Sequence, residues 1–385
     1  MWTEGPFGAL YATPSRNGIS VPREDRGEGV PMVGMGLLFG NRRLRKVSSA
    51  DLVPVSREDW LLAPDDLLFG RRSLTLAGAG KCTIVKDSDQ ALTFESSLIR
   101  VRLDVALGVP DFYFYFFESS PGRQLMSTIV EQTAVAGIRS SDLRRLVVPT
   151  PPLDEQRRIA EVLGALDDLI DTNDSQISRL RALQAGVVLQ LSQTADRAVS
   201  LGSIAAVGRE KASGDAETPY LGLEHFAEGG RGISSIGRLG EVGGGQQSFR
   251  RGDLLYGRLR PYFRKVDRVG FDGACTGEIW VLRPTGAIPL TWLAGIITSN
   301  EFTDFAMAGS EGTKMPRAKW DHVARYQVPV PSAEKLSTLN SVLEGMWEQI
   351  WALQEENEQL RRTRDELLPL LMSGAVRVRP EGVAA

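Results

Sequence analysis

The chain has 385 residues, a formal net charge of −3, 42% hydrophobic and 24% charged residues, an ordinary composition for a globular protein of two or three domains. Residues 1–6 have no signal-peptide pattern, and no apolar stretch is long enough to cross a bilayer. Two cysteines without a CxxC motif or a Cys/His cluster exclude a disulfide framework, so we expect a reducing, cytoplasmic compartment.

Residues 1–152 have the pattern of a mixed globular domain. The stretches "DDLLFGRRSLTL" at 65–76 and "FESSLIRVRL" at 94–103 predict strands, the first entered from an Asp-bearing turn. Residues 111–130 carry apolar side chains at helical spacing. We therefore predict an α+β domain over residues 1–152.

A proline-rich junction, "VPTPPLDEQRRIAEVL" at 148–163, separates this domain from a helix. Its prolines end an apolar strand, and Asp154 and Glu155 follow in the first helical turn, where the helix dipole favours negative charge. Helical spacing then continues for more than thirty residues. We predict a long central helix over residues 153–195.

Residues 196–332 follow the same plan. "GDLLYGRL" at 252–259 and "GEIWVLRP" at 277–284 predict strands, and residues 290–308 have helical spacing. We predict a second α+β domain here.

The second domain ends in a second junction, "VPVPSAEKLSTLNSVL" at 328–343. It predicts a C-terminal long helix over residues 333–375, followed by a tail of residues 376–385. The two junctions lie 180 residues apart. Further matches occur in the same order, among them "PDDLLFGRR" at 64–72 with "RGDLLYGRL" at 251–259, so we infer a tandem duplication.

Both long helices carry an a/d heptad pattern in the same phase, which predicts that they pair with each other. Closure of a tandem repeat on itself favours antiparallel helices and pseudo-two-fold symmetry. Asn173 and Asn357 each interrupt a seam once. A buried Asn at a seam position lowers the stability of a coiled coil but fixes the register of its helices. The predicted seam comprises Leu163, Leu166, Ile170, Asn173, Ile177, Leu180, Leu343, Met346, Ile350, Leu353, Asn357 and Leu360.

The predicted architecture is therefore two duplicated α+β domains held apart by an antiparallel helical rod. Each domain stands at the start of its own helix, which puts the domains at opposite ends. The heptad span of residues 156–191 or 336–371 measures roughly 54 Å at 1.5 Å per residue. Two similar domains at a fixed separation suit a periodic target, of which duplex DNA is the obvious example.

At this point the chain resembles the specificity subunit of a type I restriction–modification system. The resemblance rests on the junctions "VPTPPLDEQRRIA" and "VPVPSAEKLSTL", on "GDLLYGRLRPYFRKV" and on the duplicated plan, and it covers essentially the whole chain. The second junction departs from the family pattern because "SAEKL" replaces the usual Gln-containing end. Asp65 likewise stands where the family tends to have the glycine seen at Gly252.

The resemblance implies a non-catalytic subunit with two target-recognition domains. Each would read one half of a bipartite, asymmetric sequence in double-stranded DNA, and the helices would set the unread spacer. It also implies two methyltransferase subunits, which methylate adenine N6 with S-adenosylmethionine, and a motor–nuclease restriction subunit, which uses ATP and Mg in phage defence. The chain itself would bind no cofactor.

The sequence carries no catalytic or metal site that we can identify. "LAGAGKCT" at 76–83 misses the P-loop pattern at Thr75 and Cys82, and "GMGLLFG" at 34–40 lacks the third dinucleotide-binding glycine. His225 and His322 have no partners at metal-ligand or triad spacing. These absences fit a recognition subunit.

Charge is segregated along the chain. Residues 250–268 carry a local charge of +5, whereas residues 154–174 and 334–358 each carry −5. Basic residues interleaved with aromatic ones suit contacts to phosphates and base edges, and the acidic helices suit contacts to protein. The predicted DNA-binding residues are Arg71, Arg72, Ser73, Lys81, Arg139, Ser140, Arg258, Arg260, Tyr262, Arg264, Lys265, Thr313, Lys314, Arg317 and Lys319.

Other interpretations stay open at this point. A third basic patch, "NRRLRK" at 41–46, is either a DNA contact or an ordinary solvated turn. The chain could instead be the specificity subunit of a related fused restriction–modification enzyme, or a coiled-coil scaffold that binds protein rather than DNA. The locally basic segment favours DNA.

Overall fold

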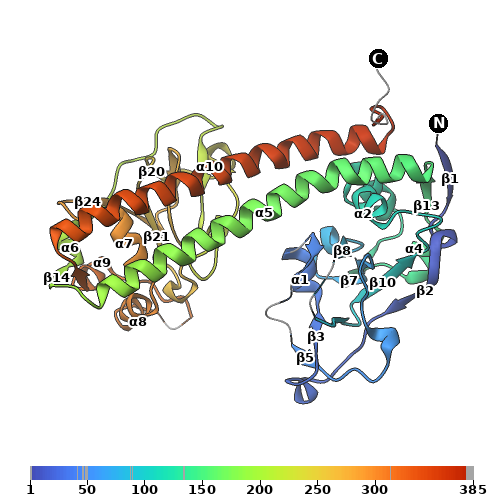
Figure 1. Ribbon diagram of the computed structural model, residues 1–385, viewed down its shortest axis with the longest axis horizontal. Helices are drawn as coiled ribbons and strands as arrows, with labels where there is room; N and C mark the ends of the chain where they lie inside the picture. Colours follow the sequence, from blue (N-terminus) through green and yellow to red (C-terminus); the bar gives the residue numbers. More distant parts are fainter. Residues whose placement is uncertain are drawn as a thin grey trace. The chain divides into compact units, whose positions relative to one another are not determined.

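A computed structural model describes residues 2–40, 42–45, 47, 51–86, 88, 90–132, 135–312 and 314–378 (Figure 1). The chain divides into two compact units, which we call unit 1 and unit 2. Unit 1 comprises Met1–Leu169 and Gln359–Ala385, and unit 2 comprises Ile170–Glu358. Each unit therefore combines one globular segment with one half of each long helix.

The two long helices are α5 (Leu153–Ser192) and α10 (Ala333–Met372). In unit 2 their halves run antiparallel, because Asn173 Nδ2 donates to Asn357 Oδ1 at 3.0 Å while Arg181, further along α5, lies over the ring of Trp347, further back along α10. In Figure 1 the two helices lie side by side within each unit.

The halves in unit 1 are antiparallel as well. Arg364 Nη1 donates to Asp167 Oδ1 at 2.8 Å, and Arg158 Nε, nearer the start of α5, donates to the carbonyl of Val378. Ile159 and Leu163 share a core with Leu371.

The main sheet of unit 1 has the strand order β2-β10-β6-β8-β4. Every residue of β6 is buried, so both faces of the sheet are covered. Leu67 and Phe69 join a core with the aromatic helix α2, whereas Leu68 points into a second core on the other face, as the period of two requires. The strands are β2 (Tyr11–Asn17), β4 (Arg43–Leu44), β6 (Leu67–Gly70), β8 (Cys82–Val85) and β10 (Leu98–Leu103).

Short elements complete unit 1, and two of its small sheets bear on function. One pairs β1 with β13 beside the first junction, and the other has the order β11-β12-β7. The strands are β1 (Thr3–Pro6), β3 (Val30–Val33), β5 (Leu52–Val53), β7 (Arg72–Ser73), β9 (Thr93–Phe94), β11 (Glu131–Gln132), β12 (Ala136–Gly137) and β13 (Val147–Thr150). The helices are α1 (Met35–Gly40), α2 (Pro110–Glu118), α3 (Ser120–Ser127) and α4 (Ser140–Arg145), with 3-10 turns at Phe7–Leu10, Arg23–Asp25, Glu58–Trp60 and Leu76–Gly78.

Unit 2 has a main sheet of order β15-β24-β21-β22 and a second sheet of order β19-β16-β23-β20, and β14 pairs with β25 beside the second junction. The strands are β14 (Arg197–Ser200), β15 (Ala205–Gly208), β16 (Pro219–Leu221), β17 (Phe226–Ala227), β18 (Gly232–Ile233), β19 (Gly237–Arg238), β20 (Gln247–Phe249), β21 (Leu254–Gly257), β22 (Val266–Arg268), β23 (Gly273–Cys275), β24 (Ile279–Pro284) and β25 (Gln327–Val330). The helices are α6 (Leu201–Ile204), α7 (Leu290–Ile297), α8 (Asn300–Ala308) and α9 (Trp320–Val323), with 3-10 turns at Leu223–His225, Leu239–Glu241 and Pro261–Phe263.

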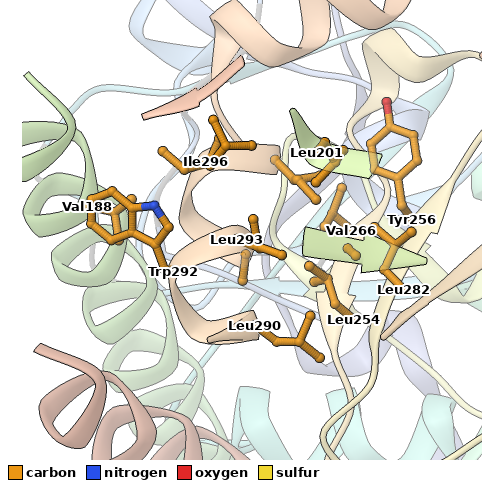
Figure 2. Close-up of a cluster of buried hydrophobic side chains, with 14 of the residues drawn as sticks. Val188, Leu201, Leu254, Tyr256, Val266, Leu282, Leu290, Trp292, Leu293 and Ile296 are labelled. Atoms are coloured by element: carbon orange, nitrogen blue, oxygen red, sulfur yellow. The ribbon is translucent and has the colours of Figure 1, made fainter. Parts of the chain in front are cut away.

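The core of unit 2 forms where α7 packs between the main sheet and α5. Figure 2 shows Leu293 of α7 facing Leu254 of β21, with Trp292 turned toward Val188 of α5. The buried indole of Trp292 donates from Nε1 to the carbonyl of Pro329 at 2.9 Å, which ties this core to the second junction.

The segments 111–130 and 290–308, which have helical spacing, each contain two helices. The break falls at Ser119 in one and at Ser299 in the other, and both serines have extended backbone. Each hydroxyl accepts a hydrogen bond from the amide three residues later, at 3.3 Å and 3.1 Å, so the serine caps a new helix. Apolar periodicity does not register such a break, because it continues through the cap.

Candidate nucleic-acid interface

The two basic loops predicted in unit 2 lie side by side. The amide of Arg260 donates to the carbonyl of Pro316 at 2.7 Å, and the amide of Ala318 donates to the carbonyl of Arg258 at 2.9 Å. Backbone pairing thus joins the loop after β21 to the hairpin of residues 309–319. Cations from segments some sixty residues apart in sequence come together on one surface.

A carboxylate organises this surface. Glu278 accepts from Arg258 Nε at 3.2 Å and from Arg317 Nε at 3.1 Å, and its backbone carbonyl accepts from the amide of Arg258. Both guanidinium groups stay more than a third exposed, so they keep donors free for a ligand. Sequence reasoning missed Glu278, because a lone acidic residue before a strand has no pattern of its own.

The loop after β21 has an unusual backbone. Arg260 and Arg264 have φ values of +52° and +49°, in the left-handed region that non-glycine residues rarely adopt. Such residues concentrate at functional sites, where surrounding structure holds them in place. Between them, Tyr262 stands 46% exposed.

Two predicted cations of this loop bind within unit 2 itself. Arg264 Nη1 donates to Asn300 Oδ1 at 2.6 Å, and Lys265 Nζ donates to the carbonyl of Leu223 at 2.8 Å. In the hairpin, Lys314 is exposed and Lys319 forms an ion pair with Glu311. Thr313 lies outside the described residues.

Unit 1 repeats the arrangement. The amide of Ile138 donates to the carbonyl of Arg71 at 3.0 Å, and Arg72 and Ser73 of β7 pair with Gly137 and Ala136 of β12. The same backbone pairing therefore joins the loop after β6 to the hairpin at 131–139.

The remaining predicted residues of unit 1 are tied locally to different extents. Arg139 is exposed and bridges to Glu131 at 2.8 Å, and the hydroxyl of Ser140 lies 3.3 Å from Asn17 Oδ1. Lys81 Nζ donates to the carbonyl of Phe39 at 3.4 Å and lies over its ring. Ser73 is buried, and its hydroxyl accepts from the amide of Thr75.

Other cations of the basic segment 250–268 dock its domain on α10. Arg268 binds both carboxylate oxygens of Glu344, at 2.6 and 3.0 Å, and Arg251 binds Glu348 at 2.5 Å. The local charge of +5 therefore overstates the charge offered to a ligand. The patch at 41–46 is a similar case.

Within that patch, Arg42 pairs with Asp167 of α5 at 3.0 Å and with Glu118 at 3.1 Å, and Arg43 and Arg45 pair with Asp168. These ion pairs attach the domain to the acidic helix α5. Asn41 and Lys46 lie outside the described residues.

The stretch that nearly matches a P-loop and the two histidines have structural roles. A strand, β8, rather than a helix follows Lys81, so the stretch at 76–83 lacks the helix start that a P-loop requires. His225 Nδ1 accepts from the amide of Gly222, and His322 stacks on Phe305 with ring centroids 4.4 Å apart. The part of the chain that the structure describes holds no group of His, Cys, Asp and Glu suited to a metal ion. Nor does any described helix have the length and apolarity needed to cross a membrane.

Comparisons with known proteins agree with one another. Residues 15–182 match the family model of the type I restriction modification DNA specificity domain. A Methanocaldococcus jannaschii protein, provisionally named the type I restriction enzyme MjaX specificity subunit, is 21% identical over 401 residues, covering 94% of this chain and 91% of the relative. The type I restriction enzyme EcoKI specificity subunit of Escherichia coli K12 is 29% identical over 178 residues, covering 44% of this chain and 37% of the relative.

A solved structure shares the fold along the whole chain. It is the S subunit of a type I restriction–modification system from M. genitalium, with a TM-score of 0.57, 17% identity and 96% coverage of both chains. Fold and interface together define a protein of two units, each with paired basic loops, built on two long helices. The family model over residues 15–182 and the relatives show which proteins this chain is similar to, namely the DNA specificity subunits of type I restriction–modification systems.

Proposed function

We propose that each unit reads one half of a bipartite, asymmetric DNA sequence. The observation that carries this proposal is the repeated interface. In both units an arginine carbonyl after a buried strand, at Arg71 and at Arg258, accepts from a hairpin amide, at Ile138 and at Ala318. The same junction of two basic loops at the same place in each unit provides two reading surfaces in one chain.

This repetition also supports a tandem duplication with pseudo-two-fold symmetry. The element orders match, since β1–β13 in unit 1 corresponds to β14–β25 in unit 2, and α2–α3 to α7–α8. On this proposal α5 and α10 set the unread spacer between the half-sites, and buried asparagines at Asn173 and Asn357 fix the register of the helices.

The acidic exposed faces of the helices are proposed to dock two methyltransferase subunits. S-adenosylmethionine would belong to those subunits, and ATP with Mg to a motor–nuclease restriction subunit. The chain would be the non-catalytic part of an adenine-N6 methyltransferase and an ATP-dependent endonuclease.

Mapping of methylated adenines in the host genome, with and without this gene, tests the proposal. We expect one bipartite motif with a constant spacer to lose methylation when the gene is deleted. A methylation map that does not change, together with no DNA binding in the presence of partner subunits, would instead support a protein-binding scaffold.

A further inference from the structure

Exposed apolar side chains stand at the tip of the candidate DNA surface in unit 1. Leu74 is 93% exposed and Val135 is 40% exposed. Ser73 pairs with Ala136 where β7 meets β12; Leu74 directly follows Ser73 in the chain, and Val135 directly precedes Ala136. An apolar side chain with so little packing contributes almost nothing to the fold.

Unit 2 has the same feature at the equivalent place. Met315 is 44% exposed and lies on the hairpin whose backbone pairs with Arg258 and Arg260. Val135 and Met315 each precede by three residues the amide, of Ile138 or of Ala318, that donates to the arginine carbonyl of the facing loop. An exposed apolar residue therefore stands at the same position relative to the backbone pairing in both units, although the local sequences differ.

Cations lie close to both tips along the chain. Arg72 and Arg139 flank the first, and Lys314 and Arg317 flank the second, all with exposed or half-exposed side chains. An apolar point within a basic surface is suited to a polyanion that also presents apolar groups. In the major groove of DNA the phosphates line the edges, and the thymine 5-methyl group is the apolar feature of the floor.

We propose that these tips enter the major groove and that Leu74 and Met315 contact thymine methyl groups, each in the half-site that its unit reads. A two-stranded ribbon fits this groove, and the flanking cations would then lie near phosphates. Any half-site that contains an adenine also presents a thymine on the opposite strand. The proposal rests on the function proposed above and adds two specificity-determining residues to it.

Thymine-to-uracil substitution tests the contact, because it removes only the methyl group. Duplexes with the mapped target would carry uracil at one thymine at a time, and affinity would be measured for the full-length chain in complex with its methyltransferase subunits. At one thymine of the first half-site we expect uracil to weaken wild-type binding about fourfold, the effect of one buried methyl group. The same uracil should leave the affinity of Leu74→Ala unchanged.

Met315→Ala should show the same insensitivity in the other half-site only. Leu107→Ala is the matched control, since Leu107 is 50% exposed and lies outside both loops; this variant should keep the wild-type response to uracil. Equal uracil effects in wild type and Leu74→Ala, or no uracil effect at any position, would overturn the proposal.

An increase in 2-aminopurine fluorescence at a base step, abolished by Leu74→Ala, would also overturn it, because the tip would then lie between bases rather than in the groove. A wild-type complex that binds no DNA would overturn the proposed function, and this inference with it. The two failures are thus distinguishable.

Discussion

Asp66 in unit 1 and Asp253 in unit 2 are buried aspartates that accept equivalent hydrogen bonds. Asp66 is fully buried and accepts from Nε and Nη2 of Arg102, both at 2.7 Å, while Asp253 accepts from Arg283 at 3.0 to 3.1 Å. Each aspartate also accepts a backbone amide three residues earlier, which closes the turn before the strand that leads to the interface. The sequence predicts these Asp-bearing turns, but it does not reveal the arginine, which comes from a strand some thirty residues later.

The residue before each aspartate shows why the two turns look different in sequence. Asp65 and Gly252 both have positive φ, at +66° and +91°. Glycine adopts this conformation freely, and aspartate is among the few other residues that tolerate it. Asp65 therefore departs from the family pattern without a change in the turn.

Asp66→Asn should destabilise unit 1. The variant keeps the shape of the side chain but loses the charge that Arg102 needs, so we expect a loss of about 1–3 kcal/mol in the free energy of unfolding. Thermal unfolding measures it. Asp59→Asn is the control, because the half-exposed side chain of Asp59 pairs with Arg16 and Arg57 at the surface and should matter less. Equal effects of the two substitutions would contradict this account of the turn.

Arg258→Ala should weaken DNA binding without unfolding unit 2. Arg258 stays partly exposed beside Glu278, so its loss removes a contact rather than a core residue. If Arg258 contacts a phosphate, the slope of log affinity against log salt should fall by about one. Arg157→Ala serves as the control, since this exposed residue lies on α5, outside both loops, and pairs with Asp154 of the same helix. Unchanged affinity at moderate salt would argue against the interface.

At the scale of elements, ion pairs attach both globular segments to the long helices. In unit 1 the contact is ionic, since Asp167 of α5 accepts from Arg42, from Arg364 and from the hydroxyl of Tyr115. In unit 2 Arg251 and Arg268 pair with Glu348 and Glu344 of α10, and their guanidinium carbons also lie 4.6 and 5.0 Å from the ring centroid of Trp351. Heptad spacing predicts that such helix positions face inward, but not which partner covers them.

The ion pairs of Asp167 should make unit 1 sensitive to acid. Burial alone would raise the pKa of Asp167, but Arg42, Arg364 and Tyr115 together hold that pKa below its ordinary value of 3.8. A carboxylate with a lowered folded pKa contributes stability above its unfolded pKa and loses it as pH falls through the folded pKa. We expect hydrogen exchange in the unit 1 half of α5 to accelerate as pH falls below 3.8, after correction for intrinsic rates.

Asp167→Asn should flatten this pH dependence, whereas Asp154→Asn, at an exposed position of the same helix, should preserve it. An unaltered acid response in Asp167→Asn would show that another group is responsible.

At the scale of the molecule, the sequence predicts the large elements better than the interface. The heptads extend over many turns, so the expected helices at 153–195 and 333–375 correspond to α5 at Leu153–Ser192 and α10 at Ala333–Met372. The loop pairing depends on two-residue strands such as β7 and β12, which are too short to have a period. The basic segments predict cations at the interface. They predict neither Glu278 nor which arginines bind the domain to the long helices.

Lengthening both long helices should widen the spacer of the target. Seven residues inserted into each of α5 and α10 keep the heptad phase and add about 10 Å, or roughly three base pairs. Adenine methylation maps should then show the same half-sites with a longer gap. Altered bases at an unchanged spacing would mean that the helices do not set the separation.

The most direct test of the central claim is an exchange of residues 1–152 for the corresponding domain of another specificity subunit, followed by mapping of methylated adenines. The account predicts that one half-site takes the sequence read by the donor while the other half-site and the spacer stay the same. Simultaneous change of both half-sites would contradict the assignment of one half-site to each unit.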